Sequence, residues 1–398
     1  MIERKEYLEK LIRFKDKDLI KVITGIRRCG KSTLFDLYCN YLLENGIEED
    51  QIIRINLEDP KYNELDNYLK LYNFILEKLN PKKKNYVFLD EVQNIDKFQK
   101  ACDGLYINKN VDLYITGSNA YLLSGELATL LSGRYVEIKM LPLSFKEYVS
   151  AFSKDSNIDR LFRDYISLGS FPYTLNLETS DDIEQYIQAI YDSIILKDVI
   201  ARKKFPDYAM LQSVVNFMLD NVGNMCSTNK IANTMTSNGR NISVHTVESY
   251  ITSLLEAFIF YKASRYDIKG KQYLKTGDKY YVTDPGIRYF LLGRKDGNRG
   301  HVLENIVYLE LKRRGYDVYI GKIDDMEIDF VAINSKVIEY YQVSETVRDE
   351  NTLKRELMPL ESVRDHYPKF LLTADIDPDT SYNGIRKINV IDWLLNKN

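Results

Sequence analysis

Along the first 150 residues, short apolar runs alternate with segments in which apolar residues recur every three or four positions. The short runs predict buried β-strands, and the longer spacing predicts amphipathic helices. Helices are expected at Lys31–Glu44 and Leu65–Leu79. The predicted strands are Leu19–Thr24, Gln51–Leu57, Tyr86–Leu89, Val111–Thr116 and Tyr135–Met140. Strands separated by helices indicate an α/β fold with a parallel sheet covered by helices on both faces.

Beyond this region the pattern changes. Residues 143–205 have helical spacing throughout, and further helices are expected between 208 and 288, where strands are also predicted at 258–264 and 279–283. From residue 301 onward a helix is followed by three strands in succession, a second helix and another strand. The pattern predicts four parts, with boundaries at 1–145, 146–206, 207–295 and 296–398.

Composition and charge exclude several classes of protein. The 398 residues carry 55 Lys and Arg against 58 Asp and Glu, a formal charge of −3, so neither a uniformly basic nucleic-acid coat nor a polyacidic tail is expected. No signal peptide and no apolar run of membrane-spanning length is visible, and no membrane association is expected. Four cysteines without paired spacing, with three His, argue against zinc and favour a cytoplasmic location. The 31 tyrosines are unusual.

A phosphate-binding loop stands between the first strand and the first long helix. It reads Gly25, Ile26, Arg27, Arg28, Cys29, Gly30, Lys31, Ser32, Thr33, a complete GxxxxGK[ST] motif. The glycines allow the backbone N–H groups to surround phosphate oxygens, and the helix N-terminus adds partial positive charge. Lys31 is expected to reach the β- and γ-phosphates of ATP, and the Ser32 hydroxyl to coordinate Mg²⁺.

Two acids follow the third strand in the segment YVFLDE. Asp90 is expected to hold Mg²⁺ through water, and Glu91 to polarise the attacking water. The alternative is that the pair only caps a helix or lies in a solvated turn. At the end of the fourth strand, Ser118 is the first candidate for a contact with the γ-phosphate or the lytic water, ahead of Thr116 and Asn119. A helix cap is the alternative role there.

Arg134 precedes the fifth strand in the segment LSGRYVEI. It is a candidate arginine finger that reaches the γ-phosphate of a neighbouring subunit. The alternative is a partner in a surface ion pair.

The P-loop, YVFLDE, ITGSNA, LSGRYVEI and PLSFKEY, in this order and spacing, resemble the AAA-type ATPases. More narrowly, the chain resembles an archaeal and bacterial group in which an ATPase module precedes a winged helix and a C-terminal restriction-endonuclease-like domain. The resemblance implies a helical lid over 146–206, a trans-acting Arg134 and a ring or other homo-oligomer, often a hexamer. The turn Gly169–Pro172 lacks the arginine that many relatives use as a second sensor, and Arg202 is an alternative source.

Residues 227–279 have the pattern of a winged helix, with helices at Ser227–Met235 and Ser243–Leu255 followed by a β-hairpin wing. Eight Lys or Arg stand against four acids there, a local charge of about +4 that suits contact with a phosphate backbone. A lid extension or a protein contact is the alternative. The candidate DNA-binding side chains are Arg240, Lys269, Lys271 and Lys275, with Tyr266 and Tyr273 interleaved.

The C-terminal part resembles the PD-(D/E)XK nuclease core, which uses an Asp and a second acid to hold Mg²⁺ and a Lys to activate water. Asp329 fits the first position, but Gln342 stands at the second acid and Ser344 at the lysine. Glu304 would restore the acidic site only in part. We therefore expect a degenerate domain without appreciable nuclease activity, whose role is to bind DNA or a partner.

Taken together, the residues and the resemblance predict an α/β P-loop NTPase with a helical lid, a winged-helix domain and a C-terminal α/β restriction-endonuclease-like domain. The predicted function is Mg²⁺-dependent ATP hydrolysis by a homo-oligomer that acts on DNA, forked or branched DNA being one such substrate. Two alternatives remain open. One is an ATP-controlled signalling or defence switch that binds protein partners, and the other is an active metal-dependent nuclease.

Overall fold

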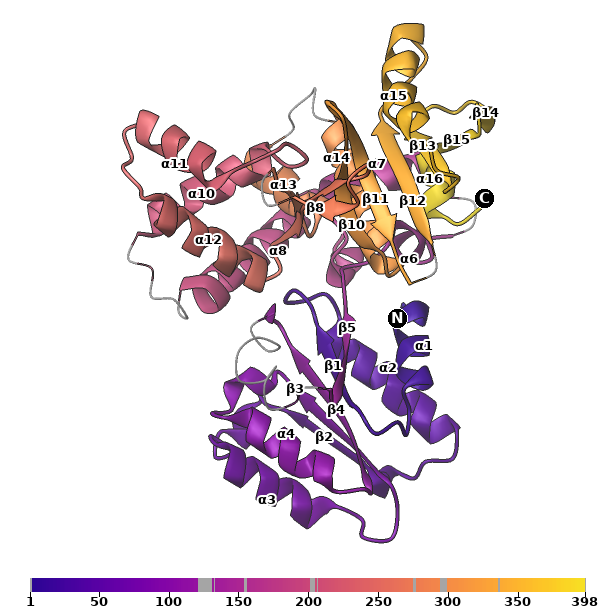
Figure 1. Cartoon of the computed structure of the whole chain (residues 1–398). Helices are drawn as coiled ribbons and strands as arrows, with labels where there is room; N and C mark the ends of the chain where they lie inside the picture. The colour runs from indigo at the N-terminus through magenta and orange to yellow at the C-terminus, as the bar shows by residue number, and fades with distance from the viewer. Residues whose placement is uncertain are drawn as a thin grey trace. The chain divides into compact units, whose positions relative to one another are not determined.

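The computed structural model describes residues 2–120, 131, 133–153, 156–200, 205, 207–274, 277–293, 299–335 and 337–397. The chain divides into two compact units (Figure 1). Unit 1 comprises Met1–Pro142 with Glu256–Phe258, and unit 2 comprises Leu143–Leu255 with Ile259–Asn398. Within the described ranges, no helix is both long enough and apolar enough to cross a membrane.

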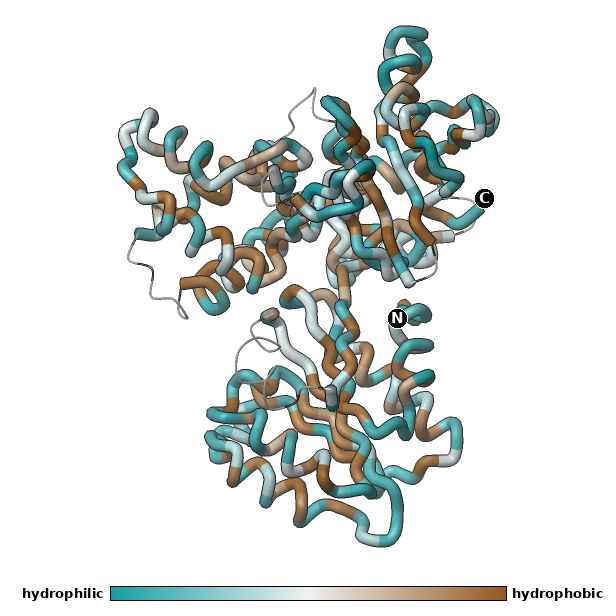
Figure 2. The backbone as a smooth tube through the Cα atoms, in the orientation of Figure 1, coloured by the Kyte–Doolittle hydropathy of each residue, from teal (hydrophilic) through white to brown (hydrophobic). Residues whose placement is uncertain are grey.

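Unit 1 contains a five-stranded sheet with the strand order β2-β3-β4-β1-β5. All neighbouring strands are parallel. The strands are β1 (Ile20–Thr24), β2 (Ile52–Asn56), β3 (Asn85–Asp90), β4 (Val111–Gly117) and β5 (Tyr135–Lys139). The predicted α/β fold with a parallel sheet is confirmed. The three central strands β1, β3 and β4 are buried along their whole length, and their apolar residues appear as brown segments in Figure 2.

Helices cover both faces of this sheet (Figure 1). They are α1 (Lys5–Arg13), α2 (Lys31–Glu44), α3 (Tyr68–Lys78) and α4 (Phe98–Ile107), with 3₁₀ turns at Glu49–Gln51, Pro60–Tyr62 and Val92–Asn94. Side chains alternate between the two faces of a strand. Val87 and Leu89 of β3 therefore pack into one core with residues of α3 and α4, whereas Phe88 between them contacts Phe35 and Tyr38 of α2.

A polar network lies within the core on the α2 side. The Lys21 ammonium, which is fully buried, forms an ion pair with Asp112 and donates to the carbonyl oxygen of Lys17 at 2.8 Å. The second Asp112 oxygen accepts from the Tyr114 hydroxyl at 2.8 Å, and the hydroxyls of Tyr114 and Tyr38 are 3.0 Å apart. A buried charge is tolerated when it is paired and hydrogen-bonded in this way.

Unit 2 begins with helices, as the spacing of apolar residues predicts. They are α6 (Phe145–Val149), α7 (Ile158–Leu168), a 3₁₀ helix (Pro172–Asn176), α8 (Ser180–Ser193), a π-helix (Ile194–Ile200), α10 (Tyr208–Asp220), α11 (Thr228–Ser237), α12 (Val244–Glu256) and α13 (Pro285–Leu292). Arg202, the proposed alternative second sensor, lies outside the described residues.

The larger sheet of unit 2 has eight strands in the order β14-β15-β13-β12-β11-β10-β7-β8. Its strands are β7 (Arg265–Asp267), β8 (Gln272–Tyr273), β10 (Asp317–Ile323), β11 (Met326–Ile333), β12 (Ile338–Ser344), β13 (Lys369–Thr373), β14 (Thr380–Tyr382) and β15 (Ile385–Asn389). Helix α15 (Glu350–Ser362) packs on one face with Val331 and Tyr340. On the other face, Tyr308 of α14 (Arg299–Arg313) contacts Phe330, and Trp393 of α16 (Val390–Leu394) contacts Tyr341.

The predicted wing is divided between two sheets. Strands β6 (Phe260–Ala263) and β9 (Lys279–Val282) form an antiparallel pair. Between them in sequence, β7 and β8 pair with each other, and β7 also pairs in parallel with β10. The hairpin is therefore continuous with the C-terminal sheet, a pairing that the sequence pattern did not predict.

The turn Gly169–Pro172 is fixed by a residue far along the chain. Asp284, fully buried, accepts hydrogen bonds from the amide and the hydroxyl of Ser170, at 2.6 and 2.5 Å. The same carboxylate caps α13 through the amide of Ile287. Gly169 has a φ of 82°, and a Cβ there would collide with the Asp284 carboxylate. The Asp284 carboxylate and the left-handed Gly169 together therefore fix the conformation of this turn.

Candidate nucleotide site

The phosphate loop joins the C-terminal end of β1 to the first residue of α2. Gly25 and Gly30 have φ values of 155° and 102°, and Arg28 is left-handed at 66°. A Cβ on Gly25 would collide with the carbonyl oxygen of Met140. Only glycine fits at this point, because the loop lies directly against another segment of backbone.

Lys31 lies inside this loop. Its side chain is only 3% exposed, and its Nζ atom donates to the carbonyl oxygens of Gly25 and Ile26 at 3.1 and 3.3 Å. The same atom is 3.4 Å from Glu91 Oε1. Burial lowers the pKa of Lys31, but the neighbouring groups, among them the charges of Glu91 and Asp90, together outweigh it and the pKa is raised. A positive charge is therefore held within the phosphate loop.

The two acids of the YVFLDE segment adopt different environments. Asp90, 1% exposed, accepts hydrogen bonds from the hydroxyls of Ser32 and Thr116. Burial raises the pKa of Asp90, and these hydrogen bonds oppose the rise. The predicted metal ligands Ser32 and Asp90 are thus brought together, with the hydroxyl and carboxylate oxygens that Mg²⁺ prefers.

Glu91 has a left-handed backbone with a φ of 55°, a conformation that is strained for a non-glycine residue and is often found at functional sites. Its carboxylate accepts a hydrogen bond from Gln93 Nε2. Burial would raise the pKa of Glu91, but the charges of Lys31 and Arg27 and the hydrogen bond from Gln93 outweigh it and lower the pKa. Glu91 is therefore an oriented carboxylate beside the Lys31 ammonium.

The polar residues at the C-terminal end of β4 make different contacts. Thr116 Oγ1 accepts from the amide of Glu91 at 3.0 Å and donates to Asp90. Ser118, the first candidate from the sequence, is fully buried and lies 3.4 Å from Gln93 Nε2. Thr116 thus orients both acids, and Ser118 contacts both Glu91 and the Gln93 amide that holds it. Asn119 is buried nearby at the end of the same strand.

Arg134 lies at the other end of the sheet. Its carbonyl oxygen accepts from the amide of Ile20, at the start of β1, whereas the phosphate loop follows the last residue of β1. Its guanidinium forms an ion pair with Asp103 of α4 and lies 5.5 Å from the centre of the Tyr106 ring. Its side chain is 44% exposed. Arg134 therefore does not contact the phosphate loop of its own subunit.

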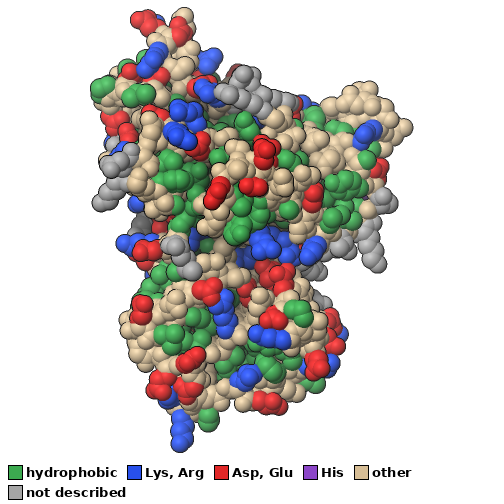
Figure 3. All heavy atoms as spheres, turned by 180° about the vertical axis from the view of Figure 1, so that it is seen from behind, with side chains coloured by type: hydrophobic (Ala, Val, Ile, Leu, Met, Phe, Trp, Pro, Cys, Tyr) green, Lys and Arg blue, Asp and Glu red, His purple; other side chains and the backbone are tan. Residues whose placement is uncertain are grey.

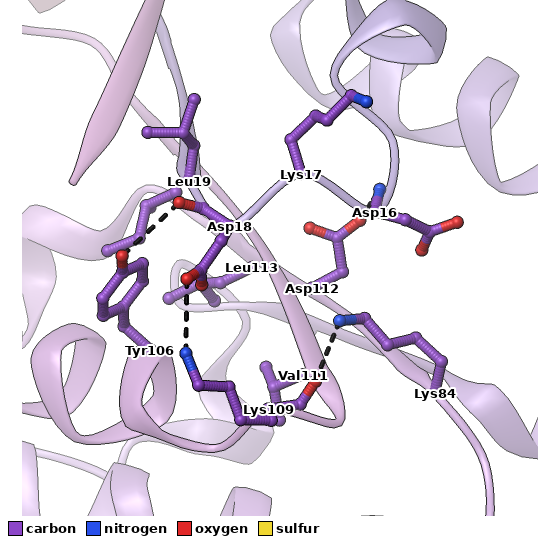
Figure 4. A pocket seen from close by; sticks show the side chains of 11 residues that line it. Asp16, Lys17, Asp18, Leu19, Lys84, Tyr106, Lys109, Val111, Asp112 and Leu113 are labelled. Carbon is purple, nitrogen blue, oxygen red and sulfur yellow. Dashed lines mark hydrogen bonds and ion pairs between the residues drawn. The ribbon is translucent and has the colours of Figure 1, made fainter.

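A cavity of about 190 Å³ lies at this opposite edge of the sheet (Figure 4). Tyr106 and Lys109 on one side bind Asp18 on the other, through its carbonyl oxygen and its carboxylate respectively. The lining alternates lysines with aspartates, so the charges largely compensate one another. The phosphate-loop residues are not among those that line this cavity.

The remaining side chains of the loop are held by neighbours. Arg27 forms an ion pair with Glu58 at 2.9 Å. Cys29 is fully buried, and burial raises the pKa of its thiol. Its carbonyl oxygen accepts from Arg4 Nη1 at 2.9 Å. Arg4 was missed by the sequence patterns, as were Thr116 as an orienting residue and Gln93.

The C-terminal acids form a second cluster, in unit 2. Lys279 of β9, buried, donates to Glu304 at 3.0 Å and forms an ion pair with Glu327 at 2.7 Å. Burial and the charge of Glu304 raise the pKa of Asp329, against the effect of Lys279. No group of three or more His, Cys, Asp or Glu among the described residues has a geometry that could hold a metal ion.

The other two residues predicted for this cluster contact different partners. Gln342 donates to Glu356 of α15 at 2.9 Å and accepts from the amide of Asp329 at 3.3 Å. Ser344 donates to the carbonyl oxygen of Thr346 at 3.1 Å. The lysine in contact with Glu304 is Lys279, which lies before the predicted C-terminal part in sequence and was not predicted to belong to it.

Two of the candidate DNA-binding side chains have partners within the chain. Arg240 donates to the carbonyl oxygen of Ala209 at 2.8 Å, and Lys269 binds both carboxylate oxygens of Asp324. Lys271 is exposed in the turn between β7 and β8, and Lys275 lies outside the described residues. On the face shown in Figure 3, acidic and basic side chains are interspersed over both units.

Comparisons with known proteins identify the class to which the N-terminal part of the chain belongs. Residues 17–149 match the family model described as an AAA domain, and residues 159–298 match a domain of unknown function (DUF8612). A Walker-type ATPase of Pyrococcus abyssi has a similar fold, with a TM-score of 0.52 and 14% identity over 73% of this chain and 96% of that one. Unit 1 is thus an AAA-type P-loop ATPase module.

Two relatives extend over most of the chain. An uncharacterized protein of Haemophilus influenzae is 44% identical over 399 residues, which cover 99% of each chain. An uncharacterized protein of Methanocaldococcus jannaschii is 28% identical over 354 residues, 83% of this chain and 76% of that protein. The chain belongs to the family of the H. influenzae protein.

Proposed function

We propose that the protein is a Mg²⁺-dependent ATPase. The observation that supports this proposal is that Lys31, Asp90 and Glu91 lie together around one phosphate loop. An ammonium, a carboxylate paired with the Ser32 hydroxyl and an ionised carboxylate are the three parts that P-loop hydrolysis of ATP requires.

In this proposal each residue has its own role. The loop amides and Lys31 bind the β- and γ-phosphates, so that Lys31 exchanges its contacts with Gly25 and Ile26 for phosphate oxygens. Ser32 and Asp90 would hold Mg²⁺, which would neutralise charge on the phosphates when bound. Glu91, oriented by Gln93, accepts a proton from the attacking water.

We further propose that the subunits assemble as a homo-oligomer in which Arg134 reaches the nucleotide of a neighbour. Its position at the opposite edge of the sheet from its own phosphate loop supports a role in trans. Asp103 and the Tyr106 ring hold the guanidinium on that edge. A neighbour's triphosphate would take the place of Asp103, since both are anions.

We propose that ATP hydrolysis serves an action on DNA. The α11–α12 pair with the β6–β9 strands resembles a winged helix, and the region 227–279 carries a charge of about +4. The intramolecular partners of Arg240 and Lys269 favour the second candidate, a switch in which the same region binds a protein. If the region acts on DNA, the exposed Lys271 can contact a phosphate group.

DNA-stimulated ATPase activity distinguishes these candidates. Turnover of Mg²⁺-ATP would be measured with single-stranded, duplex and forked DNA over a range of salt concentrations. DNA action predicts a several-fold stimulation that disappears at high salt, because phosphate contacts release counterions. Turnover that no DNA alters, together with no gel shift, would favour the protein-binding switch, and no turnover under any condition would contradict the ATPase itself.

A further inference from the structure

Arg4 is buried between two segments that are distant in sequence. Its backbone is left-handed, with a φ of 47°, and the residue is 3% exposed. Nη1 donates to the carbonyl oxygen of Cys29 in the phosphate loop at 2.9 Å. Nη2 donates to the carbonyl oxygen of Leu141 at 2.6 Å. One guanidinium thus joins the phosphate loop to the last residues of the segment Met1–Pro142 of unit 1.

Tyr7 supports this arrangement from helix α1. Its ring lies 4.9 Å from the Arg4 guanidinium carbon, and its hydroxyl accepts from the amide of Leu141 at 3.1 Å. A guanidinium is charged at all physiological pH values, and its planar fork can bind two acceptors at once. Charge-assisted hydrogen bonds of this kind are about twice as strong as neutral ones.

The contact with Cys29 fixes the direction of a peptide group. In a trans peptide the C=O of one residue and the N–H of the next point in opposite directions. Because Arg4 holds the Cys29 carbonyl oxygen toward α1, the amide of Gly30 is aimed the other way. Gly30 is the residue at which the loop meets the N-terminus of α2, where an inward amide would meet a phosphate oxygen.

The start of the loop contacts the same segment. The amide of Met140 donates to the carbonyl oxygen of Thr24 at 2.7 Å, and Gly25 lies against the Met140 carbonyl. We name Met140–Pro142 the connector, because Pro142 is the last residue of this part of unit 1 and Leu143 is the first of unit 2. Both ends of the phosphate loop are therefore attached to the connector.

We infer that Arg4 is a positioning residue of the nucleotide site, which orients the Cys29–Gly30 peptide and couples the phosphate loop to the connector. The inference rests on the proposed function, because the ligand is taken to be a nucleoside triphosphate. Nucleotide binding to the loop is then transmitted to the connector through the Arg4 guanidinium.

Hydrogen exchange of the full chain tests this coupling. It would be followed by mass spectrometry with and without Mg²⁺ and a non-hydrolysable ATP analogue, in the wild type, Arg4→Met, Arg4→Lys and Lys31→Ala. In the wild type the analogue should slow exchange in peptides that cover the loop and in those that cover the connector. At saturating analogue, Arg4→Met should keep the protection of the loop and lose most of that of the connector, where the Met140 amide keeps its bond to Thr24.

Steady-state kinetics provide a second measurement. Arg4→Met should raise the KM for ATP by roughly 10-fold, the effect of one lost charge-assisted hydrogen bond, with a smaller change in kcat. Arg4→Lys keeps a charged donor for one of the two carbonyls and should recover part of the loss. Arg4→Lys also keeps the test valid if Arg4→Met does not fold.

The outcomes separate the two proposals. If the wild type neither binds the analogue nor protects its loop, the proposed function fails and this inference fails with it. If the loop is protected while the connector is unchanged, or if Arg4→Met matches the wild type in KM and in connector protection, the inference alone is overturned. Lys31→Ala, which should show neither protection, is the negative control.

Discussion

The carboxylate of Asp284 accepts hydrogen bonds from both the amide and the hydroxyl of Ser170, 114 residues earlier in the chain. It also caps α13. This single buried acid therefore joins the turn after α7 to the helix that follows β9.

Replacing this acid should destabilise unit 2. Asp284→Ala leaves two buried Ser170 donors and a helix cap unsatisfied, and should lower the free energy of unfolding by about 2–4 kcal/mol. Ser170→Ala removes only the hydroxyl and should cost about 1 kcal/mol. Chemical denaturation of the two variants measures both values, and equal losses would contradict the role of the Ser170 amide.

Lys31→Ala should abolish tight nucleotide binding. The ammonium inside the loop is replaced by a methyl group, and the loss of a charged hydrogen bond to phosphate corresponds to about 10- to 150-fold in affinity. Titration with a fluorescent ATP analogue measures it. Lys70→Ala, which removes an exposed lysine on α3, is the matched control and should bind like the wild type.

Glu91→Gln should separate binding from hydrolysis. The amide keeps the shape of the carboxylate but cannot accept a proton, so kcat should fall by about 10²–10⁴-fold while ATP remains bound. Single-turnover measurements with radiolabelled ATP would show bound, unhydrolysed nucleotide. Glu77→Gln on the exposed face of α3 serves as the control. Unchanged turnover in Glu91→Gln would assign the base to another residue.

Arg134 can be tested by mixing subunits. Arg134→Ala should bind ATP normally and lose about 10³-fold or more in kcat. Lys31→Ala lacks nucleotide but keeps Arg134. If the finger acts in trans, a mixture of these two inactive variants should recover part of the activity, because Lys31→Ala subunits supply Arg134 to their neighbours. A mixture as inactive as its components, or full activity of Arg134→Ala alone, would contradict the assignment.

The raised pKa of Asp329 predicts that the stability of the folded protein depends on pH. Burial, with the charge of Glu304, raises the pKa of this carboxyl above its value in the unfolded chain. Its contribution to stability is therefore present at low pH and is lost as the pH rises through the folded-state pKa. Asp329→Asn is neutral at every pH and should gain thermal stability over the wild type as the pH increases.

Thermal unfolding between pH 4.5 and 8.5 checks this expectation. The difference in Tm between Asp329→Asn and the wild type should grow toward the alkaline end. Glu345→Gln changes an exposed acid in the next segment and should show no such trend. A difference that shrinks with rising pH would mean that Asp329 is stabilised as the anion.

The sequence predicted the features that are formed by residues close to one another along the chain. The phosphate loop follows from residues 25–33, and α2 begins and ends where the periodicity predicted, because a buried strand, a glycine turn and an amphipathic helix each leave their own pattern. The pair Ser32 and Asp90 was also predicted, since both follow parallel strands of one sheet, whose carboxyl ends meet at the same edge.

Contacts between distant residues left no such pattern. Arg4 and Leu141 are 137 positions apart. An arginine near the start of an amphipathic helix is usually exposed, so the pattern did not indicate a buried position for Arg4. Lys279 was counted among the charges of the wing, although it is buried against Glu304. Part of the tyrosine excess has a physical explanation of the same kind. Tyr7, Tyr114 and Tyr281 each bury a ring and use the hydroxyl to bind a polar partner.

The parallel pairing of β7 with β10 has a mechanical consequence. Because hydrogen bonds run without interruption from the hairpin that carries Lys271 to strand β14 at the far edge, the hairpin has no hinge of its own. Whatever binds at its tip would be displaced together with the whole eight-stranded sheet.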